Sequence, residues 1–181
     1  MKVKGIGLKH TVLALEKIHG KAGLERVKEA MPARLREQIG SLHPLEWYPV
    51  ELSAALHVAI RDALGGGSWS ESQRISIVAA KLDIAGPYRV LMRAVQYDTV
   101  WDRMERMWSQ YYDAGEARWV DRGHGHASAE FRGVAGFNDG MWWSIAGRVE
   151  LLLGATGARG AAVDLKDPTS TRANLEALWL E

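Results

Sequence analysis

Residues 101–133, with the sequence WDRMERMWSQYYDAGEARWVDRGHGHASAEFRG, contain the change of pattern that decides the fold. Before Gly115, large apolar and aromatic side chains recur at steps of three and four residues, which is the period of a helix. These side chains belong to Trp101, Met104, Trp108 and Tyr111. After Gly115 the period becomes two, because Ala129, Phe131 and Gly133 alternate with polar residues as in a half-buried strand. The sequence therefore predicts a helix that ends near Gly115 and a sheet that begins beyond it.

The part of the chain before Gly115 is predicted to consist of helices. Its most regular pattern follows Pro49, a residue type that suits the first turn of a helix. Apolar residues recur there at every fourth position, at Leu52, Leu56, Ile60 and Leu64. Further helices are expected to begin at Ser70, which can cap a helix, and at Pro87. We therefore expect a layer of five or six helices in this part.

The remainder of the chain is predicted to form a small, mainly antiparallel sheet with one late helix. Residues 117–119 and 128–133 suit the two strands of a hairpin, and residues 161–166 alternate like a third strand. A helix is expected over residues 138–154, between the hairpin and the third strand. Residues 173–179 fit either a strand or a helix.

Helices that precede the strands in this way indicate an α+β fold. The length of 181 residues suits one domain over residues 1–181. We expect its helical part at residues 1–115 and its sheet-containing part at residues 116–181.

The composition excludes several classes of function. The chain has 23 Lys and Arg against 22 Asp and Glu, and a formal charge of +1 gives no general attraction to nucleic acid or to an anionic membrane. The absence of Cys excludes disulfides, thiol nucleophiles and Cys-bound metals. No apolar run reaches the roughly 18 residues of a membrane span, and the first residues lack the pattern of a signal peptide. We therefore expect a cytoplasmic protein.

The order of these patterns resembles a known fold. A helical layer leads to the motif Trp-x-x-Tyr-Tyr-x-x-Gly at residues 108–115, and a late helix begins near Gly-Phe-Asn-Asp at residues 136–139. This layout resembles the fold of heme-nitric-oxide-binding domains, 4-vinyl-reductase domains and transport-particle subunits. It is also similar to a paralogous family of myxobacterial proteins of about this size. The resemblance implies a dimeric binding or interaction domain.

The sequence departs from these relatives where they hold heme or metal. Heme-binding members use a His on a central helix and a Tyr-x-Ser-x-Arg motif for the heme propionates. Here the nearest match is Tyr-Asp-Thr-Val-Trp at residues 97–101, and no His lies between His57 and His124. The Cys residues of the 4-vinyl-reductase relatives are missing as well. We therefore expect no cofactor.

The candidate ligand-binding residues are aromatic side chains on two helices. Eight of the 15 aromatic residues are Trp, a type enriched where one edge of the side chain meets water or a ligand. These side chains could line a groove, with Arg148 or Arg159 holding an acidic end of the ligand. The predicted set is Trp101, Met104, Trp108, Tyr111, Tyr112, Trp142, Trp143, Arg148 and Arg159. The alternatives are that the Trp residues fill the core in place of Phe and that the arginines are solvated.

His124 and His126 have the one spacing in the sequence that suits a metal site, because side chains two residues apart on a strand point the same way. Asp121 and Glu130 are the local candidates for a third ligand. A polar hairpin turn explains the same residues, and we expect no metal here.

Three functions remain open. The first is a non-catalytic accessory module whose aromatic groove binds a peptide segment, such as a precursor peptide for modifying enzymes, or a compact apolar or aromatic ligand. The second is a homodimeric scaffold whose exposed Trp residues anchor its interface. We expect a twofold homodimer through the N-terminal helices, where residues 52–64 offer a regular stripe, and the alternative is that the core uses this stripe and the chain is monomeric. The third is a small-molecule or heme-type sensor. The sequence indicates no catalytic residue, so we expect a binding protein instead of an enzyme.

Overall fold

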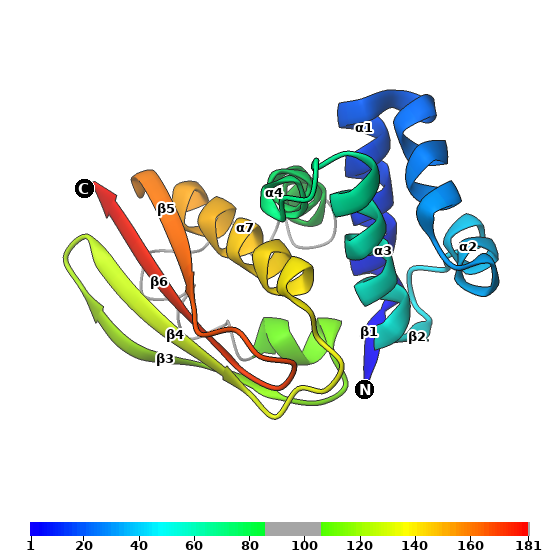
Figure 1. The fold of residues 1–181 in the computed structure, drawn as a ribbon. Coiled ribbons are helices and arrows are strands. Elements are labelled where there is room, and N and C mark those ends of the chain that lie inside the picture. Colours follow the sequence, from blue (N-terminus) through cyan, green and yellow to red (C-terminus); the bar gives the residue numbers. More distant parts are fainter. Residues whose placement is uncertain (86–105, 181) are drawn as a thin grey trace.

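The computed structural model describes residues 1–85 and 106–180 and has an α+β architecture (Figure 1). Its helices are α1 (Gly5–Ala30), α2 (Ala33–Gly40), α3 (Val50–Ala63), α4 (Ser70–Ala85) and α7 (Asp139–Ala155), and residues 106–111 are also helical. The helices predicted after Pro49 and from Ser70 are confirmed as α3 and α4. The helix predicted from Pro87 lies largely outside the described residues.

The main sheet has the strand order β3-β4-β6-β5, and all its neighbouring strands are antiparallel. Its strands are β3 (Glu116–Gly123), β4 (His126–Arg132), β5 (Arg159–Lys166) and β6 (Ala173–Leu180). The predicted hairpin and third strand are confirmed, and residues 173–179 are a strand. The alternating residues Ala173, Leu175, Ala177 and Trp179 are buried because β6 lies between β4 and β5 with one face on the core.

A second, two-stranded sheet was not predicted. Strand β1 (Lys2–Lys4) pairs antiparallel with β2 (Trp47–Pro49), and a bridge joins Val3 to Tyr112. Three-residue strands are too short to give a periodic signal in the sequence. The bridge brings the beginning of the chain next to the helical segment that precedes the main sheet.

The elements form layers that enclose two hydrophobic cores. Helix α7 covers one face of the sheet, and α4 lies between α7 and the helices α1 and α3 (Figure 1). The first core lies between the sheet and α7 and includes Phe131, Phe137 and Trp142. The second core lies among α1, α2, α3 and α4. None of the helices that the structure describes is long and apolar enough to cross a membrane.

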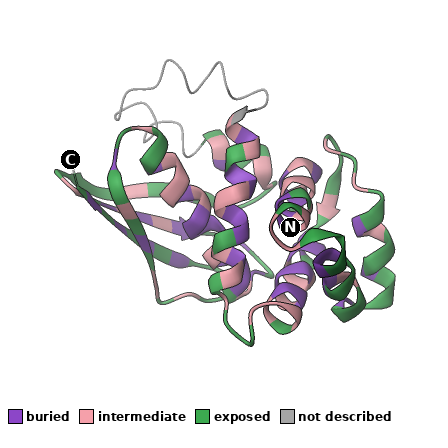
Figure 2. Ribbon diagram, turned by 90° about the horizontal axis from the view of Figure 1, so that it is seen from above, coloured by how far each residue is buried: buried purple, intermediate pink, exposed green. Residues whose placement is uncertain are grey.

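The apolar stripe of α3 faces the second core, which corrects the expected dimer interface. Leu52, Leu56 and Ile60 are 0 % exposed, and Leu64 packs against the same core. Buried and exposed positions recur in turn along the helices of the ribbon (Figure 2). Helix α3 contacts α1, α4 and α7, so its apolar face is used within the chain. The predicted homodimer interface on this stripe is therefore wrong. A homodimer through another surface stays a prediction.

Two glycines of α7 allow it to pack closely against its neighbours. A Cβ atom at Gly147 would lie 2.5 Å from the carbonyl oxygen of Gln73 on α4. A Cβ atom at Gly140 would lie 2.7 Å from the ring of Trp69. The hydroxyl groups of Ser76 and Ser144 are 2.6 Å apart across the same contact between α4 and α7. The close approach of α7 to its neighbours therefore depends on glycine, which has no side chain, at positions 140 and 147.

We expect Gly147→Ala to destabilise the protein by about 1–3 kcal/mol, because the new methyl group must displace the α4 backbone. Gly154→Ala is the matched control on α7, since a Cβ atom there has no neighbour within 4 Å. It should leave stability unchanged or raise it by up to about 1 kcal/mol through helix propensity. Urea unfolding of both variants measures the difference. Equal stability of the two variants would contradict the close packing.

Candidate ligand-binding site

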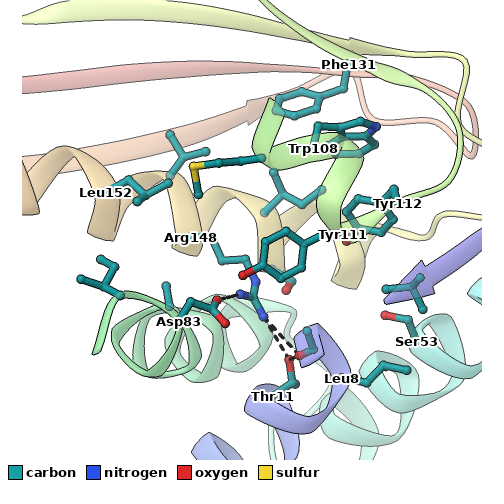
Figure 3. Close-up of a pocket in the computed structure, with 18 of the residues that line it drawn as sticks. Leu8, Thr11, Ser53, Asp83, Trp108, Tyr111, Tyr112, Phe131, Arg148 and Leu152 are labelled. Atoms are coloured by element: carbon teal, nitrogen blue, oxygen red, sulfur yellow. Dashed lines mark hydrogen bonds and ion pairs between the residues drawn. The ribbon is translucent and has the colours of Figure 1, made fainter. Parts of the chain in front are cut away.

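A cavity of about 120 Å³ lies where the two cores meet, between α1, α3, α4, α7 and the sheet. The second core contributes Val3 and Leu8, and the first contributes Trp108, Phe131 and Ile145. Figure 3 shows side chains from these elements pointing toward a common space. The lining is therefore mainly apolar and aromatic.

One buried ion pair interrupts this apolar lining. Arg148 on α7 donates a hydrogen bond from Nη1 to Oδ2 of Asp83 on α4. The other oxygen of this carboxylate, Oδ1, accepts from Nδ1 of His10 on α1. The side chains of Arg148 and Asp83 are 20 % and 9 % exposed, respectively. The interaction thus links three helices at the wall of the cavity.

Both members of the pair are charged. Burial alone would raise the pKa of Asp83, but the Arg148 guanidinium, His10 and the Tyr111 hydroxyl outweigh it and lower that pKa. Burial would lower the pKa of Arg148, and the Asp83 carboxylate outweighs it and raises that pKa. Each charge is therefore maintained by the other, as buried ion pairs require.

The guanidinium of Arg148 also contacts α1 and an aromatic ring. Its Nη2 lies 3.4 Å from the carbonyl oxygen of Gly7 and 3.4 Å from Oγ1 of Thr11 (Figure 3). Its Cζ lies 5.6 Å from the centre of the Tyr111 ring. This distance is within the range of a cation–π interaction.

The aromatic wall offers ring surfaces to the cavity. Trp108 donates its indole N–H to the carbonyl oxygen of Ala114 at 3.1 Å, and its ring stacks on Tyr112 with centroids 4.4 Å apart. Burial raises the pKa of Tyr112 to about 12, so this phenol is neutral at ordinary pH. The wall therefore supplies apolar contact without adding charge.

Four of the residues predicted from the sequence lie together at this cavity: Trp108, Tyr111, Tyr112 and Arg148. Trp101 and Met104 lie outside the described residues. The other three predicted residues, Trp142, Trp143 and Arg159, do not line the cavity.

Trp142 is 0 % exposed and belongs to the core, where its ring packs against Phe131 and Phe137 and its N–H donates to the carbonyl oxygen of Thr169 at 2.7 Å. Trp143 is half-buried and packs against the same core. Arg159 is exposed at the beginning of β5. The helical period turns residues of α7 to different sides, so Arg148 faces the cavity while Trp142 faces the sheet. Arg159 lies beyond the end of α7 and therefore does not share the face of Arg148.

Sequence reasoning missed Asp83, Thr11 and His57 as lining residues. The sequence does indicate that Asp83 is buried, because this carboxylate follows Ala79 and Ala80 by one helical turn and so lies on the apolar side of α4. Its partners could not be inferred, since His10 and Arg148 are 73 and 65 residues away in the sequence.

His57 is a buried and neutral member of the lining. It is 3 % exposed, and its Nδ1 lies 3.1 Å from Oγ of Ser72. Burial, followed by the positive charge of Arg148, lowers its pKa from 6.5 to about 3. Within residues 1–85 and 106–180, no group of three or more His, Asp or Glu side chains could hold a metal ion. His126 instead contacts Asp121, with Nε2 and Oδ2 at 3.2 Å.

We expect the neutral state of His57 to make the protein acid-sensitive. Between pH 6.5 and about 3 the unfolded chain binds a proton on His57 that the folded chain does not bind, so the free energy of unfolding falls as the pH decreases. The slope from this residue approaches about 1.4 kcal/mol per pH unit. Urea unfolding between pH 7 and roughly pH 4.5 should show a smaller slope for His57→Gln, whose side chain does not titrate. His43→Gln, at an exposed position, is the control and should keep the wild-type slope.

Comparison with solved structures shows that the chain has the fold of H-NOX domains, the heme-nitric-oxide-binding domains that the sequence resembles. The Fe(II) unliganded H-NOX protein from K. algicida is 10 % identical, with a TM-score of 0.75 over 98 % of this chain and 97 % of that chain. An oxygen complex of an oxygen-binding H-NOX domain related to soluble guanylate cyclases is 10 % identical, with a TM-score of 0.68 over 98 % and 95 %.

Sequence comparisons add no family to this result. No protein-family model matches the chain, and no curated protein matches it. The resemblance to a myxobacterial family therefore stays a prediction. The likeness to H-NOX structures at these identities shows the fold, and the predicted α+β class and heme-nitric-oxide-binding fold are confirmed.

Proposed function

We propose that the protein is a small-molecule-binding domain that uses the H-NOX fold without heme, and that its central cavity takes a compact, mainly apolar or aromatic ligand. The observation that carries this proposal is the cavity between the two cores, with Trp108, Phe131 and Ile145 in its lining and one buried ion pair at its wall. Ligand sites are typically concave and apolar, with a few polar groups that orient the ligand.

The fold supports a small ligand over a large one. The similar structures include an H-NOX domain in its oxygen complex, which is a protein that binds a very small molecule. In this chain, lining residues such as Leu8, Trp108 and Phe131 are at most 7 % exposed. A site with such buried walls suits a compact molecule, and the peptide ligand expected from the sequence stays an untested prediction.

Heme does not fit the residues that line this cavity. A heme held as in the heme-binding relatives needs a His on the central helix and cationic or hydrogen-bonding groups for its two propionates. In the described lining, Arg148 is the one cation and is already paired with Asp83, and His57 is the one imidazole and is packed against Ser72. Residues 86–105, outside the described part, contain no His in the sequence. Of the two sensor functions considered, we therefore propose the small-molecule sensor and not the heme-type sensor.

We expect the protein to bind small aromatic alcohols and hydrocarbons, such as phenylpropanol, indole and naphthalene. Trp108 and Trp119 line the cavity, so binding should change the intrinsic fluorescence, and calorimetry gives the affinity. Ala80→Met, which fills part of the cavity, should weaken binding by roughly tenfold, or about 1.4 kcal/mol. Lys81→Met adds the same side chain at an exposed position and should bind like the wild type.

Two results would contradict this function. One is that no compound of the panel binds, or that Ala80→Met and Lys81→Met bind equally well. The other is the stoichiometric uptake of hemin with a Soret band, measured in a protein titrated with hemin, because the donor groups described above would then be sufficient for heme.

A further inference from the structure

Two hydroxyl groups in the cavity wall are open to a ligand. Ser53 on α3 is 6 % exposed, and Tyr112 follows the helical residues 106–111; Figure 3 shows both side chains among those that point into the cavity. Over residues 1–85 and 106–180, neither hydroxyl makes a hydrogen bond, and neither oxygen is sealed by surrounding atoms. A buried hydroxyl without a partner is unfavourable, so these two groups favour a ligand atom that bonds to them.

The hydroxyls of Thr11 and Ser144 also belong to the lining, but they are bonded within the protein. Thr11 donates from Oγ1 to the carbonyl oxygen of Gly7 at 2.9 Å, which is the usual bond of a hydroxyl inside a helix. Ser144 lies with its Oγ 2.6 Å from Oγ of Ser76. The free capacity for hydrogen bonds is therefore not spread evenly over the wall.

Ser53 and Tyr112 border the same part of the cavity. Strand β1 connects their elements, because Val3 forms a bridge with Tyr112 and the carbonyl oxygen of Met1 accepts from the N–H of Val50 at 3.2 Å, at the beginning of α3. Val3 lines the cavity as well. The two open hydroxyls thus lie on elements that meet at β1.

The groups around this part of the wall do not favour an ionised ligand. Burial raises the pKa of Tyr112 to about 12, so its phenol is neutral, and His57, one helical turn after Ser53, is neutral as well. The guanidinium of Arg148 is compensated by Asp83. A charged ligand group would therefore lose its hydration without gaining a free counter-charge.

From these observations we propose that the ligand carries one uncharged oxygen, in a carbonyl or hydroxyl group, on its apolar or aromatic body, and that Ser53 and Tyr112 donate hydrogen bonds to this oxygen. Such an oxygen has two lone pairs and accepts from both hydroxyls. The inference rests on the proposed function, because it names the class of ligand for the same cavity. The remainder of the lining, which is mainly apolar, contacts the body of the ligand.

Four probes with one aromatic ring test this inference: acetophenone, 1-phenylethanol, ethylbenzene and benzoate. At pH 7.4, calorimetry on the full chain should show acetophenone and 1-phenylethanol binding roughly fivefold tighter than ethylbenzene, as expected for a hydrogen bond between neutral groups. Benzoate, which is ionised at this pH, should bind most weakly. Ethylbenzene binding as tightly as the ketone and the alcohol, or benzoate binding most tightly, would overturn the inference and leave the proposed function standing. Binding of none of the four would overturn both.

Two nearly isosteric variants test the roles of the two hydroxyls. Tyr112→Phe and Ser53→Ala should each weaken acetophenone binding by roughly two- to fivefold and leave ethylbenzene binding unchanged, which reports an intact cavity. Tyr48→Phe is the matched control, because Tyr48 lies on β2 outside the described lining and its hydroxyl accepts from the N–H of His43 at 2.8 Å. It should bind both probes like the wild type. Full retention of the preference for acetophenone over ethylbenzene when both hydroxyls are removed together would overturn the inference.

Discussion

The buried ion pair between Asp83 and Arg148 lies where the two cores of this molecule meet, and it joins elements from both sides. One core lies among the N-terminal helices and the other between α7 and the sheet, and the pair lies at the cavity where they meet. With His10 it joins α1, α4 and α7. Two charges removed from water require each other, so this interaction limits how far the three helices can separate.

The ion pair is the charged part of a cavity that is otherwise mainly apolar. The fold that this chain shares with H-NOX structures does not fix what it binds, because the side chains at a site decide that. Here they are aromatic rings, a neutral imidazole and one compensated guanidinium. Mainly apolar linings with a few polar groups are typical of sites for small molecules.

The Trp residues show how one residue type serves two purposes. Trp142 is buried between the sheet and α7 and donates its N–H to a backbone carbonyl. Trp108 is also nearly buried, yet one part of its ring lines the cavity. The sequence is compatible with Trp residues in the core and with Trp residues at a cavity, and both positions occur because the cavity is an incompletely filled region of the core.

The sequence by itself determined the elements whose periodicity is local. Helices α3 and α4, the hairpin of β3 and β4, the late helix α7 and the α+β order all follow from spacings within about 20 residues. It also indicated Trp108, Tyr111, Tyr112 and Arg148, which line the cavity. Tertiary structure alone decided that residues 173–179 are a strand, since their pattern fits two structures until β4 and β5 lie on either side. It alone placed His10, Asp83 and Arg148 in contact, because the free energy of a buried charge depends on partners that are distant in the sequence and close only in the folded chain.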